Sequence, residues 1–309
     1  MNKKSFRQQF FSVTAMLIAT IIWGLAFSAQ SSGMRFTGAM VFVALRSIVG
    51  GLALIAVVAC MDLIREKRCS FWGRAQSRRE RITLLIGGIS CGVIIGSASI
   101  FQQLGLQHVS AGKTGFLTAL YIIFVPLLGI FFRRKTSWLM LAGTFLALFG
   151  TYLLCGGADT VGYGEWMVII CAVLFAGHII VIDHYAGQCD CVRLSCIQFM
   201  TAAAVATAAA LLFREKWQWQ AVYDSMFFWM FCGVGSSAIA FTLQIVAQKY
   251  LHPVTAALLM SMESVFAVVG GWLFLNEKLS GREIAGCLII LLAVIIAQLP
   301  EKRLKKSAG

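Results

Sequence analysis

Charged residues are scarce in this chain of 309 residues, of which only 13% are Asp, Glu, Lys or Arg. Soluble proteins carry roughly 25% of such residues, so this chain has too little charge to cover a water-exposed surface. We therefore exclude an ordinary soluble enzyme. Proline is also rare, at three residues, so little in the sequence interrupts a helix. Apolar residues, in contrast, make up 59% of the chain and give a mean hydropathy of +0.83, which predicts an integral membrane protein.

The apolar residues stand in continuous runs, not in the alternating pattern of barrel strands. A helix needs about 20 apolar residues to cross a bilayer, where its backbone must satisfy its own hydrogen bonds. We therefore expect an all-α integral membrane fold without a separate soluble domain. The runs predict ten transmembrane helices, at residues 10–30, 38–61, 82–103, 111–132, 137–155, 165–183, 192–213, 225–248, 253–275 and 281–299.

The first run, with its basic flank, also resembles a cleavable signal peptide. It is long for the apolar core of such a peptide, and its removal would destroy the ten-helix count and the internal repeat. We favour a retained helix.

Basic residues give the chain a net charge of +13, which could indicate nucleic-acid binding if they formed one surface. If the N-terminus is cytoplasmic, however, 19 of the 26 Lys and Arg residues fall in cytoplasmic segments, six fall outside and Arg46 lies within a span. The positive-inside rule predicts this asymmetry. We expect a multi-pass protein of the cytoplasmic (inner) membrane in contact with lipid, with cytoplasmic basic tails at 1–9 and 300–309 and no nucleic-acid partner.

The chain also repeats itself. A shift of 142 residues aligns GSASIFQQLGLQHVSAGKTGFL, from Gly96, with AIAFTLQIVAQKYLHPVTAALL, from Ala238. A shift near 153 aligns Trp23-Gly24 with Ala176-Gly177.

The repeat divides the chain into two units of five predicted helices, residues 10–155 and 164–299. Because five is odd, the second unit enters the membrane from the opposite side. Inverted repeats of this kind build many secondary transporters, which bind substrate at the repeat interface near the bilayer midplane.

Several segments resemble the EamA domain of the drug/metabolite transporter superfamily. They are Trp23-Gly24, ALRSIVGG around Arg46, SAGKTGFLTALYIIFVPLLG and TAALLMSMESVFAVVGGWLFLNEKLSG. The resemblance covers about residues 13–299. It implies a proton- or exchange-coupled carrier, often an exporter of amino acids or other small metabolites. The family pattern often has Glu-Pro where this chain has Glu263-Ser264, so no proline bend is expected there.

Ionisable side chains within spans mark candidate sites, because each costs about 2.5–3.5 kcal/mol on insertion scales. Glu263 is the candidate for proton coupling or for a substrate amine, and the alternative is a structural hydrogen bond or ion pair between helices. Its counterpart at a shift of 142 is the uncharged Tyr121. Arg46 either anchors a substrate carboxylate or phosphate or pins neighbouring carbonyl groups. His178 either titrates near neutral pH or packs between helices.

Three buried glutamines and five aromatic residues complete the predicted site. The amides need partners, which other residues or a zwitterionic ligand would supply. The aromatic residues either wall an apolar cavity or fill the core and face lipid. The predicted substrate-binding residues are Trp23, Phe27, Arg46, Phe101, Gln102, Tyr121, His178, Gln198, Gln244, Glu263 and Phe266.

These features favour a secondary transporter, and not an enzyme, for a small polar or amphipathic metabolite such as an amino acid. It would act as an exporter or exchanger by alternating access, with protons as the candidate coupling ion. No P-loop, H-E-x-x-H or dinucleotide-binding pattern occurs, so we expect no ATP-driven transport, no cofactor and no metal site. The alternatives are a lipid or isoprenoid flippase and a membrane-embedded enzyme acting on such a lipid. The sequence specifies neither the substrate nor an oligomeric state.

Overall fold

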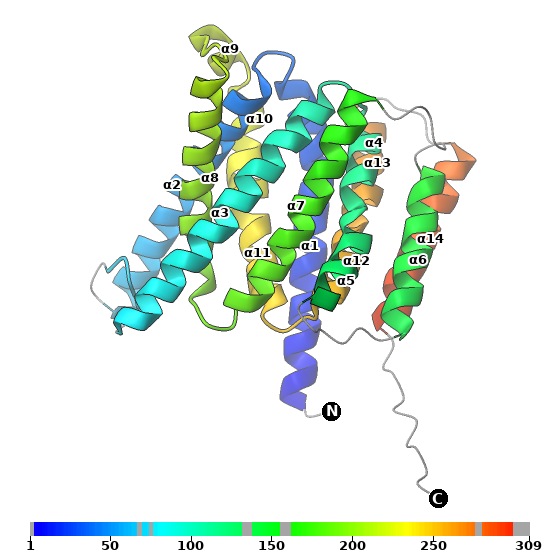
Figure 1. Cartoon of the computed structure of the whole chain (residues 1–309), viewed down its shortest axis with the longest axis horizontal. Coiled ribbons are helices and arrows are strands. Elements are labelled where there is room, and N and C mark those ends of the chain that lie inside the picture. The colour runs from blue at the N-terminus through cyan, green and yellow to red at the C-terminus, as the bar shows by residue number, and fades with distance from the viewer. Residues whose placement is uncertain are drawn as a thin grey trace, which may run out of the picture.

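A computed structural model describes residues 3–66, 70–73, 77–131, 138–154, 162–275 and 280–298. The described residues form a bundle of helices and contain no strand, which confirms the all-α prediction for this part of the chain (Figure 1). The elements are α1 (Lys3–Gly33), α2 (Ala39–Glu66), α3 (Arg78–Leu106), α4 (Ala111–Ala119), α5 (Tyr121–Phe131), α6 (Trp138–Leu154), α7 (Tyr163–Tyr185), α8 (Cys191–Leu212), α9 (Trp219–Asp224), α10 (Met226–Phe231), η1 (Cys232–Ala240), α11 (Phe241–Gln248), α12 (Pro253–Met260), α13 (Met262–Leu275) and α14 (Gly281–Gln298).

Eight helical stretches of the described chain are long and apolar enough to cross a bilayer. They lie on α1, α2, α3, α4 with α5, α7, α8, α10 through α11, and α12 with α13. The fifth and tenth predicted spans coincide with α6 and α14, whose apolar stretches are shorter, at Leu141–Gly150 and Ile284–Ile296. These two helices pack on each other at one edge of the bundle (Figure 1).

The chain ends differ from the predicted boundaries. Helix α1 already begins at Lys3, so most of the N-terminal segment predicted as a tail continues the helix, because Lys, Arg and Gln are good helix formers. The predicted tail 300–309 and the predicted span ends at 132, 137, 155 and 299 lie outside the described residues. Helix α1 begins and α14 ends at the same end of the bundle, called here the terminal end; the opposite end is the far end (Figure 1).

Two of the membrane helices are broken at matching places. The helix of α4 and α5 is interrupted at Leu120 (φ −59°, ψ −14°), and that of α12 and α13 at Ser261 (φ −61°, ψ −17°). Each break continues as a tight turn, in which the N–H of Ile123 donates to the carbonyl of Leu120 and that of Ser264 to the carbonyl of Ser261. The second break thus forms without the proline of the family pattern.

A third irregularity is η1, a π-helix of nine residues within an otherwise α-helical span. Its sequence, CGVGSSAIA, consists almost entirely of small residues. π-Helical turns are rare and concentrate at functional sites. The sequence predicts a regular helix here, because hydrophobic runs do not distinguish the two helix types.

Packing between helices follows one pattern in both predicted units. Helix α3 packs on α7 and α8, while η1 packs on α1 and α2 and its continuation α11 packs on α1. Helix α13 packs on α1, while α4 and α5 pack on α7. Helices α2 and α8 pack on each other, as α6 and α14 do. Every one of these contacts has a counterpart when the helices of the two units are exchanged.

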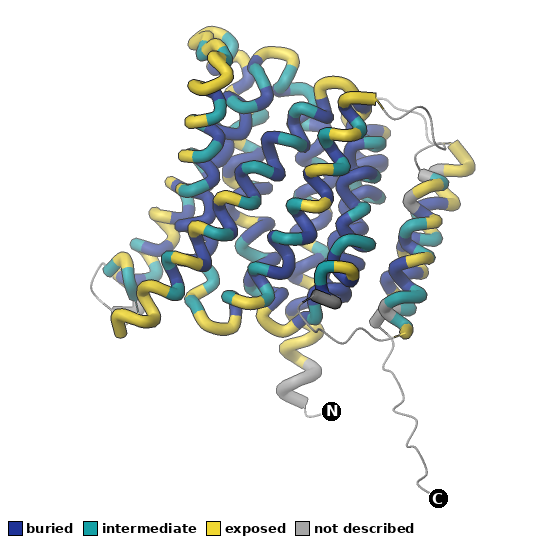
Figure 2. Tube along the Cα trace, viewed as in Figure 1, coloured by how far each residue is buried: buried dark blue, intermediate teal, exposed yellow. Residues whose placement is uncertain are grey.

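Residues on the inward faces of the helices are buried, and residues on the outward faces are exposed (Figure 2). Large apolar side chains dominate the outward faces, and Leu212 and Phe227 are 78% and 72% exposed. An exposed apolar surface of this extent is the surface expected to contact lipid.

Gly24 allows a close approach between α1 and α13. A Cβ atom at this position would overlap the side chain of Phe266 and lie 2.8 Å from the backbone nitrogen of Ala267. Its counterpart in the repeat, Gly177, has no neighbouring atom within 4 Å of an added Cβ.

We predict that Gly24→Ala destabilises the protein and that Gly177→Ala does not. Overpacking costs about 1–3 kcal/mol, more than the roughly 1 kcal/mol that Ala gains over Gly in a helix. Thermal unfolding of the detergent-solubilised variants measures both effects. Equal melting temperatures for the two variants would contradict the packing of α1 on α13.

Candidate functional site

A small pocket, called here the cavity, lies at the centre of the bundle. Its lining comes from helices of both predicted units, and no lining residue is more than 6% exposed. The lining residues are Trp23, Phe27, Gln30, Arg46, Gln102, Tyr121, Phe175, Ser236, Phe241, Met260 and Glu263.

Helix α1 supplies a polar and aromatic face to this cavity. Trp23, Phe27 and Gln30 are four and three residues apart, so they share one side of the helix. The indole Nε1 of Trp23 is buried and has no hydrogen-bond partner among the described residues. This donor is available to a molecule in the cavity.

Arg46 marks the cationic side of the cavity. Its Nη1 donates to Oε1 of Gln30 at 2.7 Å, and its Nη2 donates to Oγ of Ser99 at 2.8 Å. Gln103 Nε2 donates to the same Gln30 oxygen at 2.6 Å. The partners are neutral, the guanidinium Nε has no partner, and no carboxylate of the described chain forms an ion pair with Arg46. The buried positive charge therefore remains uncompensated.

Glu263 marks the acidic side. The hydroxyl of Tyr121 donates to its Oε1 at 3.1 Å, and no cationic side chain of the described chain pairs with it. Tyr121 begins α5 and Glu263 lies in the first turn of α13, directly after the two helix breaks. The positive end of the α13 dipole favours a carboxylate at this position.

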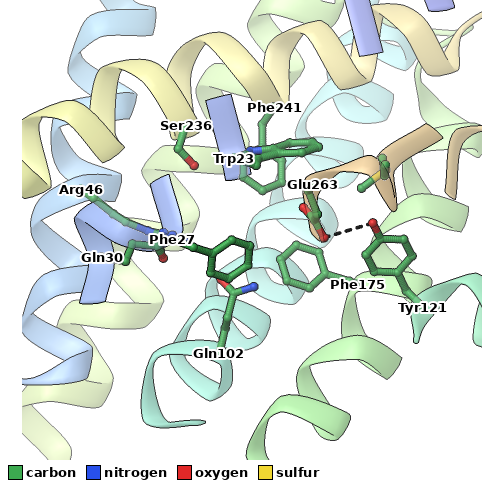
Figure 3. A pocket seen from close by; sticks show the side chains of 11 residues that line it. Trp23, Phe27, Gln30, Arg46, Gln102, Tyr121, Phe175, Ser236, Phe241 and Glu263 are labelled. Carbon is green, nitrogen blue, oxygen red and sulfur yellow. Dashed lines mark hydrogen bonds between the residues drawn. The ribbon is translucent and has the colours of Figure 1, made fainter. Parts of the chain in front are cut away.

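Aromatic rings separate the two charged sides. Figure 3 shows Arg46 and Gln30 on one side of the pocket and Glu263 with Tyr121 on the other. The rings of Trp23 and Phe241 have centroids 4.7 Å apart, and Phe175 stacks on Phe241 at 6.4 Å. The cavity thus combines an apolar wall with one cationic and one acidic group, as small-molecule sites do.

The structure brings six of the eleven predicted site residues to this cavity. The other five lie elsewhere. His178 and Gln198 pair with each other, with 2.9 Å between Nε2 and Oε1, while Gln244 donates to Gln248 at 2.8 Å. Partly buried Phe101 packs against the main hydrophobic core, as Phe266 does.

The predicted equivalence of Gln102 and Gln244 does not hold in the cavity. Gln102 lines it and donates to Thr118 at 3.3 Å, whereas Gln244 donates to Gln248 on its own helix. A glutamine one turn away is an available partner on α11 but not on α3, where the corresponding residue is Leu106.

Sequence reasoning missed five lining residues: Gln30, Phe175, Ser236, Phe241 and Met260. Gln30 could have been found, because it lies three residues after Phe27 on the same face of α1. Ser236 could not, because its direction depends on the π-helix that carries it.

The model of the EamA-like transporter family matches residues 10–156 and, a second time, residues 162–298. The chain belongs to the EamA-like transporter family. Curated relatives of this EamA-family chain include an uncharacterized transporter of Archaeoglobus fulgidus, 28% identical over 218 residues, which are 67% of this chain and 68% of the relative. The uncharacterized transporter YoaV of Bacillus subtilis is 22% identical over 285 residues, 89% of this chain and 92% of the relative.

A solved crystal structure matches this EamA-family chain with a TM-score of 0.75 at 20% identity, covering 96% of this chain and 99% of the other. At this identity the match supports the fold alone. Family membership confirms the predicted resemblance and makes the chain a membrane transporter. Together with the apolar helices, it makes the chain a multi-pass membrane protein.

We predict that Tyr121 and Glu263 stabilise the EamA fold jointly. Tyr121→Phe leaves the buried carboxyl without its donor, which costs about 1–3 kcal/mol. In a Glu263→Met background the same change costs less, because the acceptor is gone. A double-mutant cycle by thermal unfolding measures the coupling. Additive effects of the two substitutions would contradict the hydrogen bond.

Proposed function

We propose that this EamA-family transporter carries a small zwitterionic or amphipathic metabolite, such as an amino acid, by alternating access. The observation that carries the proposal is that an arginine and a glutamate line one cavity and that neither forms an ion pair among the described residues. Arg46 offers a bidentate fork to a carboxylate, and Glu263 offers an acceptor to an amine or takes up a proton. A ligand with both charges would compensate each buried group at once.

We infer that the two units are inverted repeats of five membrane helices. The two separate family matches, the matched breaks at Leu120 and Ser261, and the exchangeable packing pattern support this arrangement. Tyr121 and Glu263, which a shift of 142 residues relates, meet by a hydrogen bond, as residues near a pseudo-two-fold axis do. Inverted repeats with a central site are the usual basis of alternating access.

The same proposal includes the orientation of the chain in the membrane and the coupling of transport to protons. The excess of Lys and Arg in the segments predicted to be cytoplasmic supports cytoplasmic termini in an inner membrane. Glu263 is the candidate coupling group, because a carboxyl that alternates between protonated and charged forms can link proton movement to substrate release. Export or exchange is the proposed direction.

The alternative of a lipid flippase requires a lateral opening from the cavity to the bilayer. No residue lining the cavity is more than 6% exposed, so this structure offers no observation in favour of such an opening. The carrier proposal is therefore the one we develop.

We predict saturable uptake of at least one amino acid into proteoliposomes that contain the purified protein. Arg46→Gln should weaken the apparent affinity about 10- to 100-fold, because a hydrogen bond to a charged group contributes about 1.5–3 kcal/mol. Arg35→Gln is the matched control, since Arg35 is exposed. The absence of saturable flux across an amino-acid and metabolite panel, with and without a pH gradient, would overturn the proposal.

We predict that Glu263→Gln abolishes the response of this flux to an imposed pH gradient. The amide still accepts the hydrogen bond from Tyr121 but is not protonated at any pH used in such an assay. Tyr121→Phe, which keeps the carboxyl, should retain the response. An unchanged pH profile in Glu263→Gln would assign the residue a structural role only.

A further inference from the structure

A carboxylate closes each end of the α2–α8 pair, and at the far end it belongs to Glu215. This residue lies between α8 and α9, and its Oε2 accepts from the backbone N–H groups of Met40 at 2.9 Å and Val41 at 3.0 Å. These groups belong to the first turn of α2, where helix N–H groups lack partners within the helix. Burial raises the pKa of Glu215, and the two donated hydrogen bonds counteract the rise.

Gly38 gives the Glu215 carboxylate its room, because a Cβ on Gly38 would overlap that group. The far-end contact therefore depends on the absence of a side chain just before α2. It connects the first predicted unit, which contains α2, to the second, which contains Glu215.

At the terminal end, the carboxylate belongs to Asp62, near the end of α2. Arg193, in the first turn of α8, donates from Nη2 to Oδ1 of Asp62 and from Nε to the carbonyl of Phe71 at 3.1 Å. Asp62 and Arg193 are only 4% and 5% exposed. This contact also joins the first unit to the second.

The two contacts are copies of each other in the repeat. The shift of 153 residues that aligns Trp23-Gly24 with Ala176-Gly177 carries Asp62 to Glu215 and Met40 to Arg193. Each contact thus joins a carboxylate near the C-terminal end of one of the two helices to the first turn of the other. The partner differs: backbone N–H groups receive Glu215, whereas a guanidinium receives Asp62.

We propose that these contacts are two latches, each holding one end of the transporter closed. When the transporter opens toward one side, the contact at that end breaks while the contact at the other end stays formed. The inference rests on the proposed alternating access, in which this structure, with both contacts formed, corresponds to the state closed at both ends. Asp62 and Glu215 are positioning residues, because neither lines the cavity.

The two latches should respond differently to substitution, because Asp62 forms an ion pair with Arg193 whereas Glu215 caps a helix. Removing one partner of a buried ion pair leaves an uncompensated charge, whereas removing a helix cap leaves N–H groups that water can reach. Loss of the Asp62 carboxylate should therefore cost more stability than loss of the Glu215 carboxylate.

Amide hydrogen exchange of the full chain in detergent tests the two latches separately. We expect Glu215→Ala to raise exchange about tenfold in residues 38–44 and 210–218, and to leave residues 56–66 and 189–196 unchanged, since exchange follows the local opening equilibrium. Asp62→Ala should have the opposite pattern. Asp224→Ala is the matched control, because Asp224 is an exposed carboxylate near the far end that bonds only within α9.

Two further variants keep the test decisive. Glu215→Gln retains an acceptor oxygen and should restore most of the far-end protection. If Asp62→Ala does not fold, the double substitution Asp62→Ala/Arg193→Met removes both charges and should still expose the terminal end alone. If a single substitution changed amide exchange equally at both ends, or changed it at neither end, the proposal of two separate latches would be overturned. Exchange needs no substrate, so this outcome is distinct from a failure to detect transport.

Discussion

The hydrogen bond from Tyr121 to Glu263 is the contact on which the centre of this transporter depends. It joins two membrane helices at their breaks, where the backbone leaves its regular pattern. Irregular backbone at membrane depth is tolerated only where it is buried in protein or lines a cavity. The breaks, the bond between them and the cavity beside them therefore belong together.

An arginine and a glutamate in one cavity give it its chemistry. Arg46 is held by neutral partners, and Glu263 by a hydroxyl, so neither side chain forms an ion pair within the described protein. Such an arrangement costs stability and is typical of functional sites. In the proposed mechanism, the substrate or a proton supplies the missing countercharge, and the aromatic wall excludes water that would weaken these interactions.

Much of the fold follows from the sequence, because apolar runs and the repeat depend only on which residues follow one another. Glu263, Tyr121 and Arg46 were predictable for a similar reason: polar groups are conspicuous in apolar helices. The π-helix with Ser236 and the pairing of His178 with Gln198 were not, since they depend on how neighbouring helices rotate and pack. The break at Ser261 was missed because it contains no proline.

Ligand-induced thermal stabilisation tests the central claim most directly, namely that one cavity recognises both charges of a zwitterion. Each member of an amino-acid panel would be compared with its amide, which lacks the carboxylate, and its desamino acid, which lacks the amine. Binding to the folded state raises the melting temperature by mass action. The account predicts that at least one amino acid stabilises the protein and that both of its analogues stabilise it markedly less. Equal stabilisation by all three compounds would contradict it.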